Sequence, residues 1–243
     1  MRRFVLLMCA GAAALLLASG AVWAIEPPWP KPTKECDRGG GLCVGTAHRD
    51  AIYGSKAADD IRARAGHDFA HARPGNDAAY GGPGRDDLRG GTGHDDLHGG
   101  SLRDGLDGDS GRDTLHGGSW GDSLDGDADD DTVRGGLGGD SLDGDDGDDA
   151  LHGGPGNDHV YSTGSGVDRL YGGDGDDHLY VWEDAEQDYF YCGQGHDIYY
   201  LRDADSSHHV SASCEEERLM FIPPANPGDP VGILLPPLEF YYD

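Results

Sequence analysis

Gly81-Gly82-Pro83-Gly84-Arg85-Asp86-Asp87-Leu88 belongs to the stretch that decides the fold, which runs from Thr46 to Leu201. Within this stretch an aspartate returns every nine residues from Asp50 to Asp158, and then with small insertions up to Asp197. Two residues after each aspartate stands a mostly apolar residue, and glycines usually lie five, four and two residues before it. A short fixed period of this kind is typical of a protein built by stacking repeated units.

The repeat aspartates are followed by a row of residues that we expect to point inward. One apolar residue between two polar ones predicts a very short strand with one side buried. Glycines in the six residues between strands permit the positive φ angles that a tight turn needs. The predicted inward residues are Ile52, Ile61, Ala70, Ala79, Leu88, Leu97, Leu106, Leu115, Leu124, Val133, Leu142, Leu151, Val160, Leu170, Leu179, Phe190 and Tyr199.

A second period of eighteen residues indicates that two strand-and-turn units complete one coil. Asp109, Asp127 and Asp145 recur at this spacing, and Gly100, Gly118, Gly136 and Gly154 hold the equivalent position of the alternate units. The residues after the apolar position also alternate, with Asp107, Asp125 and Asp143 in one set and His98, His116, Arg134 and His152 in the other. The two faces of the coil are therefore expected to differ chemically.

This block closely resembles the RTX family of calcium-binding repeats, whose consensus is G-G-x-G-x-D-x-U-x. The segments 90–98 (GGTGHDDLH) and 153–161 (GGPGNDHVY) match it at every fixed position. The resemblance covers roughly two thirds of the chain. It implies an all-β fold, a parallel β-roll in which Ca²⁺ ions lie along the turns. We accordingly expect a right-handed β-solenoid with two nonapeptides per coil and short N- and C-terminal caps.

Charge also points to a cation. The chain has 46 acidic and 18 basic residues and a formal net charge of −28, which argues against binding to nucleic acid phosphates. Aspartates stacked about 5 Å apart would repel one another by roughly 1 to 3 kcal/mol per pair. Calcium accepts six to eight oxygen ligands in flexible geometry, whereas magnesium demands a stricter octahedron. Aspartates eighteen residues apart, such as Asp95 and Asp113, could share one ion.

The predicted Ca²⁺ ligands lie where the glycine frame is regular. They are Asp77, Asp86, Asp95, Asp104, Asp113, Asp122, Asp131, Asp140, Asp149, Asp158, Asp168 and Asp177. Asp50, Asp59 and Asp188 are weaker candidates because the frame fails around them. We expect several ions, bound with the weak affinity of extracellular modules, and a chain that is loose or disordered at low calcium.

The ends of the chain differ from the repeats. Residues 1–24 resemble a secretory signal, with Arg2 and Arg3 ahead of an apolar run and Val22-Trp23-Ala24 at the cleavage position. An uncleaved membrane anchor from Phe4 to Ile25 is the alternative. Residues 25–45 form a Pro/Gly-rich linker or N-terminal cap, 46–201 the β-roll, and 202–243 a C-terminal cap and tail. We expect a secreted, extracellular protein without a membrane span after cleavage.

Four cysteines would remain after cleavage. Their even number in an exported chain suggests two disulfides. The local pairing Cys36–Cys43 with Cys192–Cys214 would fasten the two ends of the repeat block, although the other two pairings stay open. A zinc site is a poor alternative because the chain has no CxxC or CxxH pair.

No catalytic signature appears, neither H-E-x-x-H nor G-x-S-x-G, and we expect no enzyme. The first functional hypothesis is a secreted calcium-binding structural or scaffold module. The second is calcium-dependent recognition of a polysaccharide or cell surface, for which the outward positions show no row of exposed aromatic residues. The third is a fragment of a secreted toxin. The outward histidines could bind a transition metal, but a solvated sheet face explains them more simply.

Overall fold

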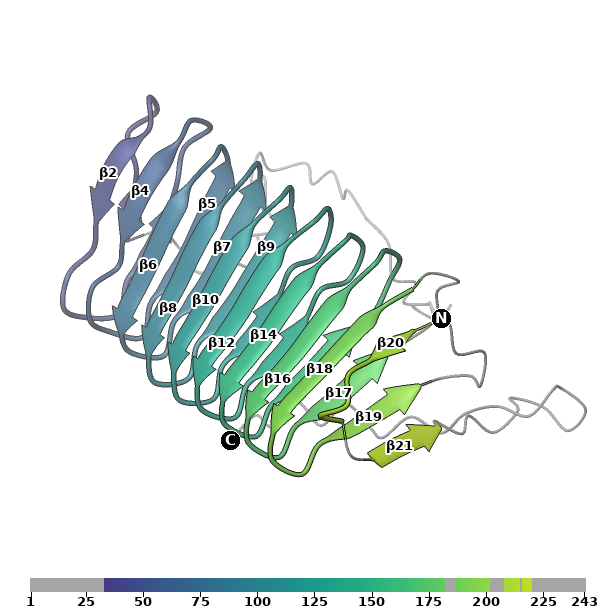
Figure 1. Ribbon diagram of the computed structural model, residues 1–243. Coiled ribbons are helices and arrows are strands. Elements are labelled where there is room, and N and C mark those ends of the chain that lie inside the picture. Colours follow the sequence, from purple (N-terminus) through teal and green to yellow (C-terminus); the bar gives the residue numbers. More distant parts are fainter. Residues whose placement is uncertain (1–32, 182–186, 202–207, 215, 220–243) are drawn as a thin grey trace, which may run out of the picture. The chain divides into compact units, whose positions relative to one another are not determined.

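The computed structural model describes residues 33–181, 187–201, 208–214 and 216–219 (Figure 1). Every regular element in these ranges is a strand. No helix in the same ranges is long and apolar enough to cross a membrane. The predicted signal segment 1–24 and the tail beyond residue 219 lie outside the described residues.

The strands form two sheets, and alternate strands belong to alternate sheets. The first sheet has 11 strands: β1 (Lys34–Glu35), β3 (Ala51–Tyr53), β5 (Phe69–Pro74), β7 (Asp87–Thr92), β9 (Gly105–Ser110), β11 (Ser123–Asp125), β13 (Ser141–Asp143), β15 (His159–Ser162), β17 (His178–Val181), β19 (Ile198–Leu201) and β21 (Glu216–Leu219). The second has 10: β2 (Gly41–Val44), β4 (Asp59–Arg62), β6 (Ala78–Pro83), β8 (Asp96–Ser101), β10 (Thr114–Ser119), β12 (Thr132–Leu137), β14 (Ala150–Pro155), β16 (Arg169–Asp174), β18 (Tyr189–Gln194) and β20 (His209–Val210).

Neighbouring strands in each sheet are parallel and differ by one coil of the chain. Leu115 of β10, for example, lies in register with Leu97 of β8 and Val133 of β12. The offset is eighteen residues on both sides, which is two nonapeptides. The predicted all-β parallel β-roll is therefore confirmed, and so is the assignment of two repeats to each coil.

Strands outside the repeat block extend both sheets at their ends. β1 and β2 arise from the segment predicted as a linker or cap and pair with β3 and β4. β20 and β21 arise from the C-terminal segment and pair with β18 and β19. Disulfides join Cys36 to Cys43 and Cys192 to Cys214, which confirms the local pairing. Each disulfide lies at one end of the stack of coils.

The core is a single apolar row between the two sheets. The predicted inward residues from Ile52 to Phe190 are all buried, each 2% exposed or less. They pack into one continuous cluster drawn from both sheets. Tyr199 is the exception, because it is only partly buried and packs against the end of that cluster. Each coil thus contributes two inward side chains, at about 2 kcal/mol of burial each.

The turns explain the glycines of the repeat. The residues four and two positions before the aspartate usually have positive φ, as in Gly91 (113°) and Gly93 (137°). Where the sequence departs from glycine, the backbone keeps this conformation. Among the described residues, the non-glycine residues with positive φ are Arg64, Arg73, Leu102, Asp109, Trp120, Asp127, Asp129 and Asp145, all at one of these two positions.

Replacing Gly93 with alanine is expected to destabilise the folded roll by about 3 kcal/mol, because its positive φ disfavours any side chain and the added Cβ atom would collide with the neighbouring coil. A Cβ atom there would overlap the carbonyl oxygen of Gly75 in the preceding coil. Gly105→Ala is the matched control, since a Cβ at Gly105 meets nothing within 4 Å. Thermal unfolding in calcium should separate the two variants, and equal melting temperatures would contradict the register described here.

The outer faces carry rows of stacked aromatic rings that are half-buried or buried rather than exposed. On the second sheet His152, Tyr171 and Tyr191 stack with centroids 4.3 and 4.6 Å apart. On the first sheet Tyr161, Tyr180 and Tyr200 stack at 4.7 and 4.5 Å. The rows arise because positions eighteen to twenty residues apart become cross-strand neighbours, and flat rings in register stack readily.

Candidate metal site

The predicted ligands all lie at the turns, with their carboxylates directed into the protein. Each of the twelve, from Asp77 to Asp177, is no more than 3% exposed. Each carboxylate stands immediately before or near the start of a strand, at the point where the chain changes sheets. A charged side chain is normally buried only when a partner compensates its lost hydration.

One oxygen of each carboxylate has such a partner. The main-chain N–H of Asp95 donates to Oδ1 of Asp113 at 2.7 Å, and the N–H of Asp113 donates to Oδ1 of Asp131 at 2.6 Å. The same bond links Asp104 to Asp122 at 2.9 Å, and it recurs through the whole predicted set. The aspartates therefore form two ladders along the coils, one along each line of turns.

The other oxygen, Oδ2, has no hydrogen-bond partner in eleven of the twelve predicted residues, Asp168 being the exception. A buried acceptor left unsatisfied costs about 1–3 kcal/mol, and more when it is charged. A hollow lies beside this atom. A Cβ added to Gly81 would stand 2.5 Å from Oδ2 of Asp86 and 2.7 Å from the carbonyl oxygen of Gly99 in the next coil. The missing side chain of glycine thus leaves a space lined by carboxylate and carbonyl oxygens.

The electrostatics of the ladder are unfavourable to bare carboxylates. The pKa of Asp104 is raised to about 8, first by burial and then by the charges of Asp122 and Asp86, against the lowering effect of the N–H of Asp86. Burial likewise raises the pKa of Asp131 and Asp149 to about 8. At eight others the rise is smaller: burial raises the pKa to about 7 at Asp95, Asp113, Asp122 and Asp177 and to about 6 at Asp77, Asp86, Asp140 and Asp158.

Among the weaker candidates, Asp50 and Asp59 have a hydrogen-bond donor at Oδ2. Oδ2 of Asp50 accepts hydrogen bonds from the N–H and hydroxyl of Thr46 at 2.6 and 2.9 Å. Burial acts to raise the pKa of Asp50, but hydrogen bonds, chiefly from Thr46, outweigh it and the pKa is lowered. Oδ2 of Asp59 accepts from the N–H of Ser55 at 2.6 Å, whereas its Oδ1 has no hydrogen-bond partner. Oδ2 of Asp188 lies 3.2 Å from Nδ1 of His208, but that nitrogen accepts from the N–H of Asp188 and Oδ2 has no hydrogen-bond partner.

Asp168 and Asp68 differ from the sequence-based set. Asp168 is in that set, yet its Oδ2 accepts a hydrogen bond from the Ser162 hydroxyl at 2.5 Å. Asp68 was not in the set, yet its Oδ2 is buried and has no hydrogen-bond partner. Gly66, two residues before Asp68, is the sequence feature from which Asp68 could have been predicted as a candidate. Asp68 and Asp77 share a further difference, because Ala63 and Ala72 occupy the position five residues before the aspartate, which is glycine in most of the other units.

A second group of carboxylates lies on β9 and β11 and just beyond the ends of β11 and β13. The ligand atoms of Asp107, Asp109 and Asp127 lie within 4.8 Å of one another, as do those of Asp125, Asp127 and Asp145. Burial, with the charges of Asp127 and Asp143 next, raises the pKa of Asp125 to about 7. The eighteen-residue recurrence of these residues is visible in the sequence, where it predicts only that the two faces of the coil differ chemically.

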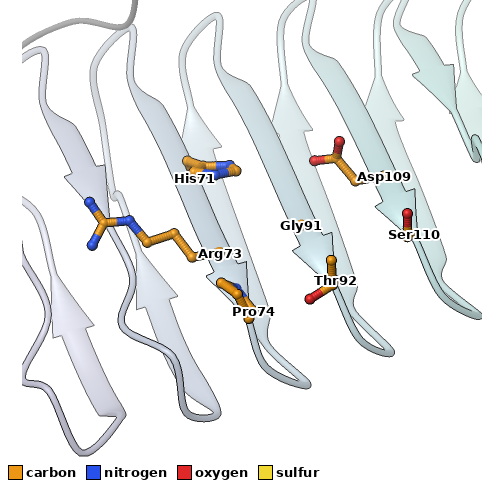
Figure 2. A pocket seen from close by; sticks show the side chains of 7 residues that line it. All are labelled: His71, Arg73, Pro74, Gly91, Thr92, Asp109 and Ser110. Carbon is orange, nitrogen blue, oxygen red and sulfur yellow. The ribbon is translucent and has the colours of Figure 1, made fainter. Parts of the chain in front are cut away.

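The pocket in Figure 2 follows from the same register. Its volume is about 300 Å³, and it is lined by His71, Arg73, Pro74, Gly91, Thr92, Asp109 and Ser110. Gly91 lies in register between Arg73 of β5 and Asp109 of β9. The depression is therefore the space left where a row of side chains is interrupted by a glycine.

Comparison with known proteins identifies the repeat. The family described as the RTX calcium-binding nonapeptide repeat matches residues 44–79, 71–106, 107–142, 125–160 and 162–199. These segments include all twelve predicted ligands and span more than half of the chain. No curated protein matches the chain. The repeat pattern, the parallel roll and the family match agree, and the chain belongs to the RTX calcium-binding nonapeptide repeat family.

Proposed function

We propose that this protein is a secreted structural module whose β-roll folds when several Ca²⁺ ions bind at its turns. The observation that carries the proposal is the two ladders of buried aspartates, in which every predicted ligand except Asp168 has an unsatisfied Oδ2, in most cases beside an oxygen-lined hollow. Oxygen donors of carboxylate and carbonyl type are the ligands that calcium prefers. A divalent ion would neutralise carboxylates that burial otherwise holds in an unfavourable state.

The residues best suited to hold calcium combine an unpaired Oδ2 with a glycine five residues earlier. They are Asp86, Asp95, Asp104, Asp113, Asp122, Asp131, Asp140, Asp149, Asp158 and Asp177. The carbonyl oxygens of Gly99 and Gly108, in the coils that follow Gly81 and Gly90, would contribute further ligands. Asp168 is less suited because Ser162 already satisfies its second oxygen.

Secretion and a non-catalytic role complete the proposal. Two disulfides are stable in an oxidising compartment and rare in the cytosol. The signal-like segment 1–24 agrees with export. One oxygen of each ladder carboxylate accepts a main-chain hydrogen bond, and the other is proposed to bind metal. A structural task therefore accounts for these carboxylates without catalysis.

Polysaccharide recognition gains little support from the aromatic rows. Sugars pack against the exposed faces of aromatic rings, but in the row Tyr161, Tyr180 and Tyr200 neighbouring rings stack face to face. Their faces therefore cover one another, and chiefly their edges are left for a ligand.

Equilibrium dialysis with radioactive calcium tests the proposal. The purified chain is expected to bind several Ca²⁺ ions, half-saturated at about 10⁻⁴–10⁻³ M as in other extracellular modules. Magnesium at the same concentration should not displace them, since it needs a stricter octahedral site. Binding of one ion or none, or equal binding of magnesium, would contradict the proposal.

A further inference from the structure

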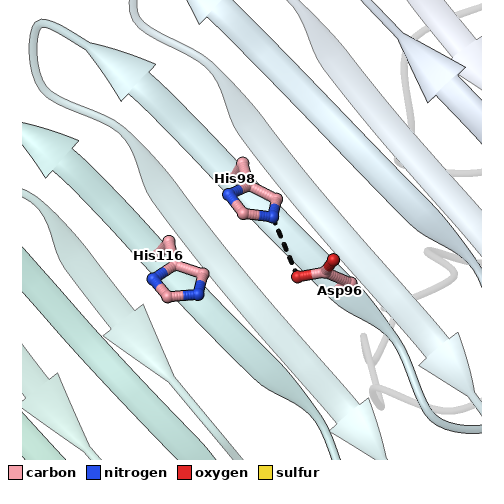
Figure 3. Close-up of side chains that lie close together, drawn as sticks. All are labelled: Asp96, His98 and His116. Atoms are coloured by element: carbon pink, nitrogen blue, oxygen red, sulfur yellow. Dashed lines mark ion pairs between the residues drawn. The ribbon is translucent and has the colours of Figure 1, made fainter.

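A cluster of nitrogen and oxygen ligands lies on the outer face of the second sheet, away from the turns. His98 of β8 and His116 of β10 are register partners in neighbouring strands. Asp96 precedes His98 by two residues and so projects from the same face of β8. Figure 3 shows the carboxylate of Asp96 next to the ring of His98, with the ring of His116 beside it.

The geometry brings three donors of different residues together. Nε2 of His98 lies 2.9 Å from Oδ1 of Asp96. The two imidazole rings stack with centroids 4.8 Å apart and planes inclined by 15°. One ligand atom of each of the three residues lies within 4.8 Å of the other two. Tyr80 stacks on the far side of His98 at 4.8 Å, which restricts the tilt of that ring.

The cluster is also suited to a metal in its protonation and accessibility. Burial lowers the pKa of His116, and the neighbouring His98 and Arg134 lower it further, while Asp96 opposes them. His116 therefore favours the neutral form that coordinates a metal. The side chains of His98 and Asp96 are 34% and 48% exposed, so an ion can reach them from solvent.

We propose that Asp96, His98 and His116 form a binding site for one divalent transition-metal ion of the zinc class. Imidazole nitrogens with one carboxylate are typical zinc ligands, whereas calcium selects oxygen donors. Donors on one zinc ion lie roughly 3–3.5 Å apart, given bond lengths of about 2.0–2.2 Å. Rotation of the three side chains can bring their donor atoms to this separation, and water would complete the coordination. The site rests on the proposed function, because it exists only when β8 and β10 are paired.

The same chain offers two matched controls. His152 occupies the same row and stacks on Tyr171, but Ala150 stands where Asp96 stands relative to His98. His159 and His178 are also register partners, with centroids 5.0 Å apart. Their Nδ1 atoms lie 3.5 and 3.1 Å from the Tyr180 hydroxyl, and the cluster with a carboxylate is not repeated there among the described residues.

Zinc binding to the full chain, measured by equilibrium dialysis in about 10 mM calcium to keep the turns saturated, tests the site. Asp96→Asn, His98→Gln and His116→Gln should each weaken the binding of one Zn²⁺ ion by at least about tenfold, since even indirect partners of zinc ligands cost that much. His152→Gln and His159→Gln should leave that affinity unchanged. Cobalt, used as a spectroscopic probe, should lose its visible absorption in the same three variants only.

Circular dichroism in calcium, recorded for every variant, separates the two proposals. If the roll forms and zinc binds equally well to all five variants, the zinc site is wrong and the calcium proposal stands. If calcium produces no β structure, the strands that carry the three residues do not pair, and both proposals fail. Loss of zinc binding in His152→Gln alone would also overturn the assignment, because it would move the site along the row.

Discussion

Replacing Asp95, Asp113 and Asp131 together with asparagine is expected to stabilise the calcium-free roll and to weaken its response to calcium. The carboxamide oxygen can keep the main-chain bond that Oδ1 now accepts. The amide nitrogen replaces an unsatisfied charged oxygen and can donate to the carbonyl that lines the same hollow, such as that of Gly126 beside Asp113. Removing three such oxygens should stabilise the metal-free fold by roughly 3 kcal/mol or more.

The same change removes calcium ligands, so the calcium concentration at half-folding should rise at least about tenfold. Urea unfolding in chelator and in saturating calcium measures both effects. The matched control replaces Asp87, Asp146 and Asp148 with asparagine, because this changes the net charge by the same amount as the tested variant but at exposed positions. The interpretation fails if the asparagine triple variant is less stable than the parent in chelator.

Acidification of the calcium-free protein is expected to promote folding. The pKa of Asp104, Asp131 and Asp149 is raised to about 8, and that of Asp95 and Asp113 to about 7, mainly by burial, against the ordinary value of 3.8. Between the ordinary pKa of 3.8 and the raised values of about 7 to 8, the folded state binds more protons than the unfolded state. Its stability is therefore greatest near or below pH 4 and falls as pH rises through 6 to 8.

Circular dichroism in chelator from pH 8 to pH 5 measures this effect, stopping above the sequence pI of about 4.4. We expect β structure to increase as pH falls, by a change in stability of several kcal/mol when the sites are summed. Because protons compete with calcium for the same carboxylates, the calcium requirement should rise over the same interval. If the calcium-free protein instead lost β structure towards pH 5, the inference that protonation stabilises these buried carboxyl groups would be wrong.

Periodicity allowed most of the fold to be predicted. In a stacked coil the nine-residue count fixes which side chains point inward, and the eighteen-residue count fixes which residues become neighbours. The buried row from Ile52 to Phe190 and the different faces of the two sheets follow from these counts. The positive φ of Trp120 and Leu102 shows that the frame holds even where glycine is absent.

The candidate site was less predictable, because it depends on individual partners outside the period. Ser162 reaches Asp168 through an insertion that interrupts the nine-residue count. His208, whose Nδ1 lies 3.2 Å from Oδ2 of Asp188, comes from beyond the repeats altogether. The pairing of His98 with Asp96 depends on side-chain rotation, which the spacing of residues does not determine. Such contacts decide which carboxylates remain unsatisfied, and therefore which can hold a cation.

We infer that cations between buried aspartates hold the coils together. Circular dichroism of the purified chain at pH 7.5, titrated with calcium from chelator to about 10 mM, measures whether the fold depends on them. The expected result is little β structure in chelator and a cooperative gain of β structure as calcium rises. Full β structure in chelator, unchanged by added calcium, would contradict the claim.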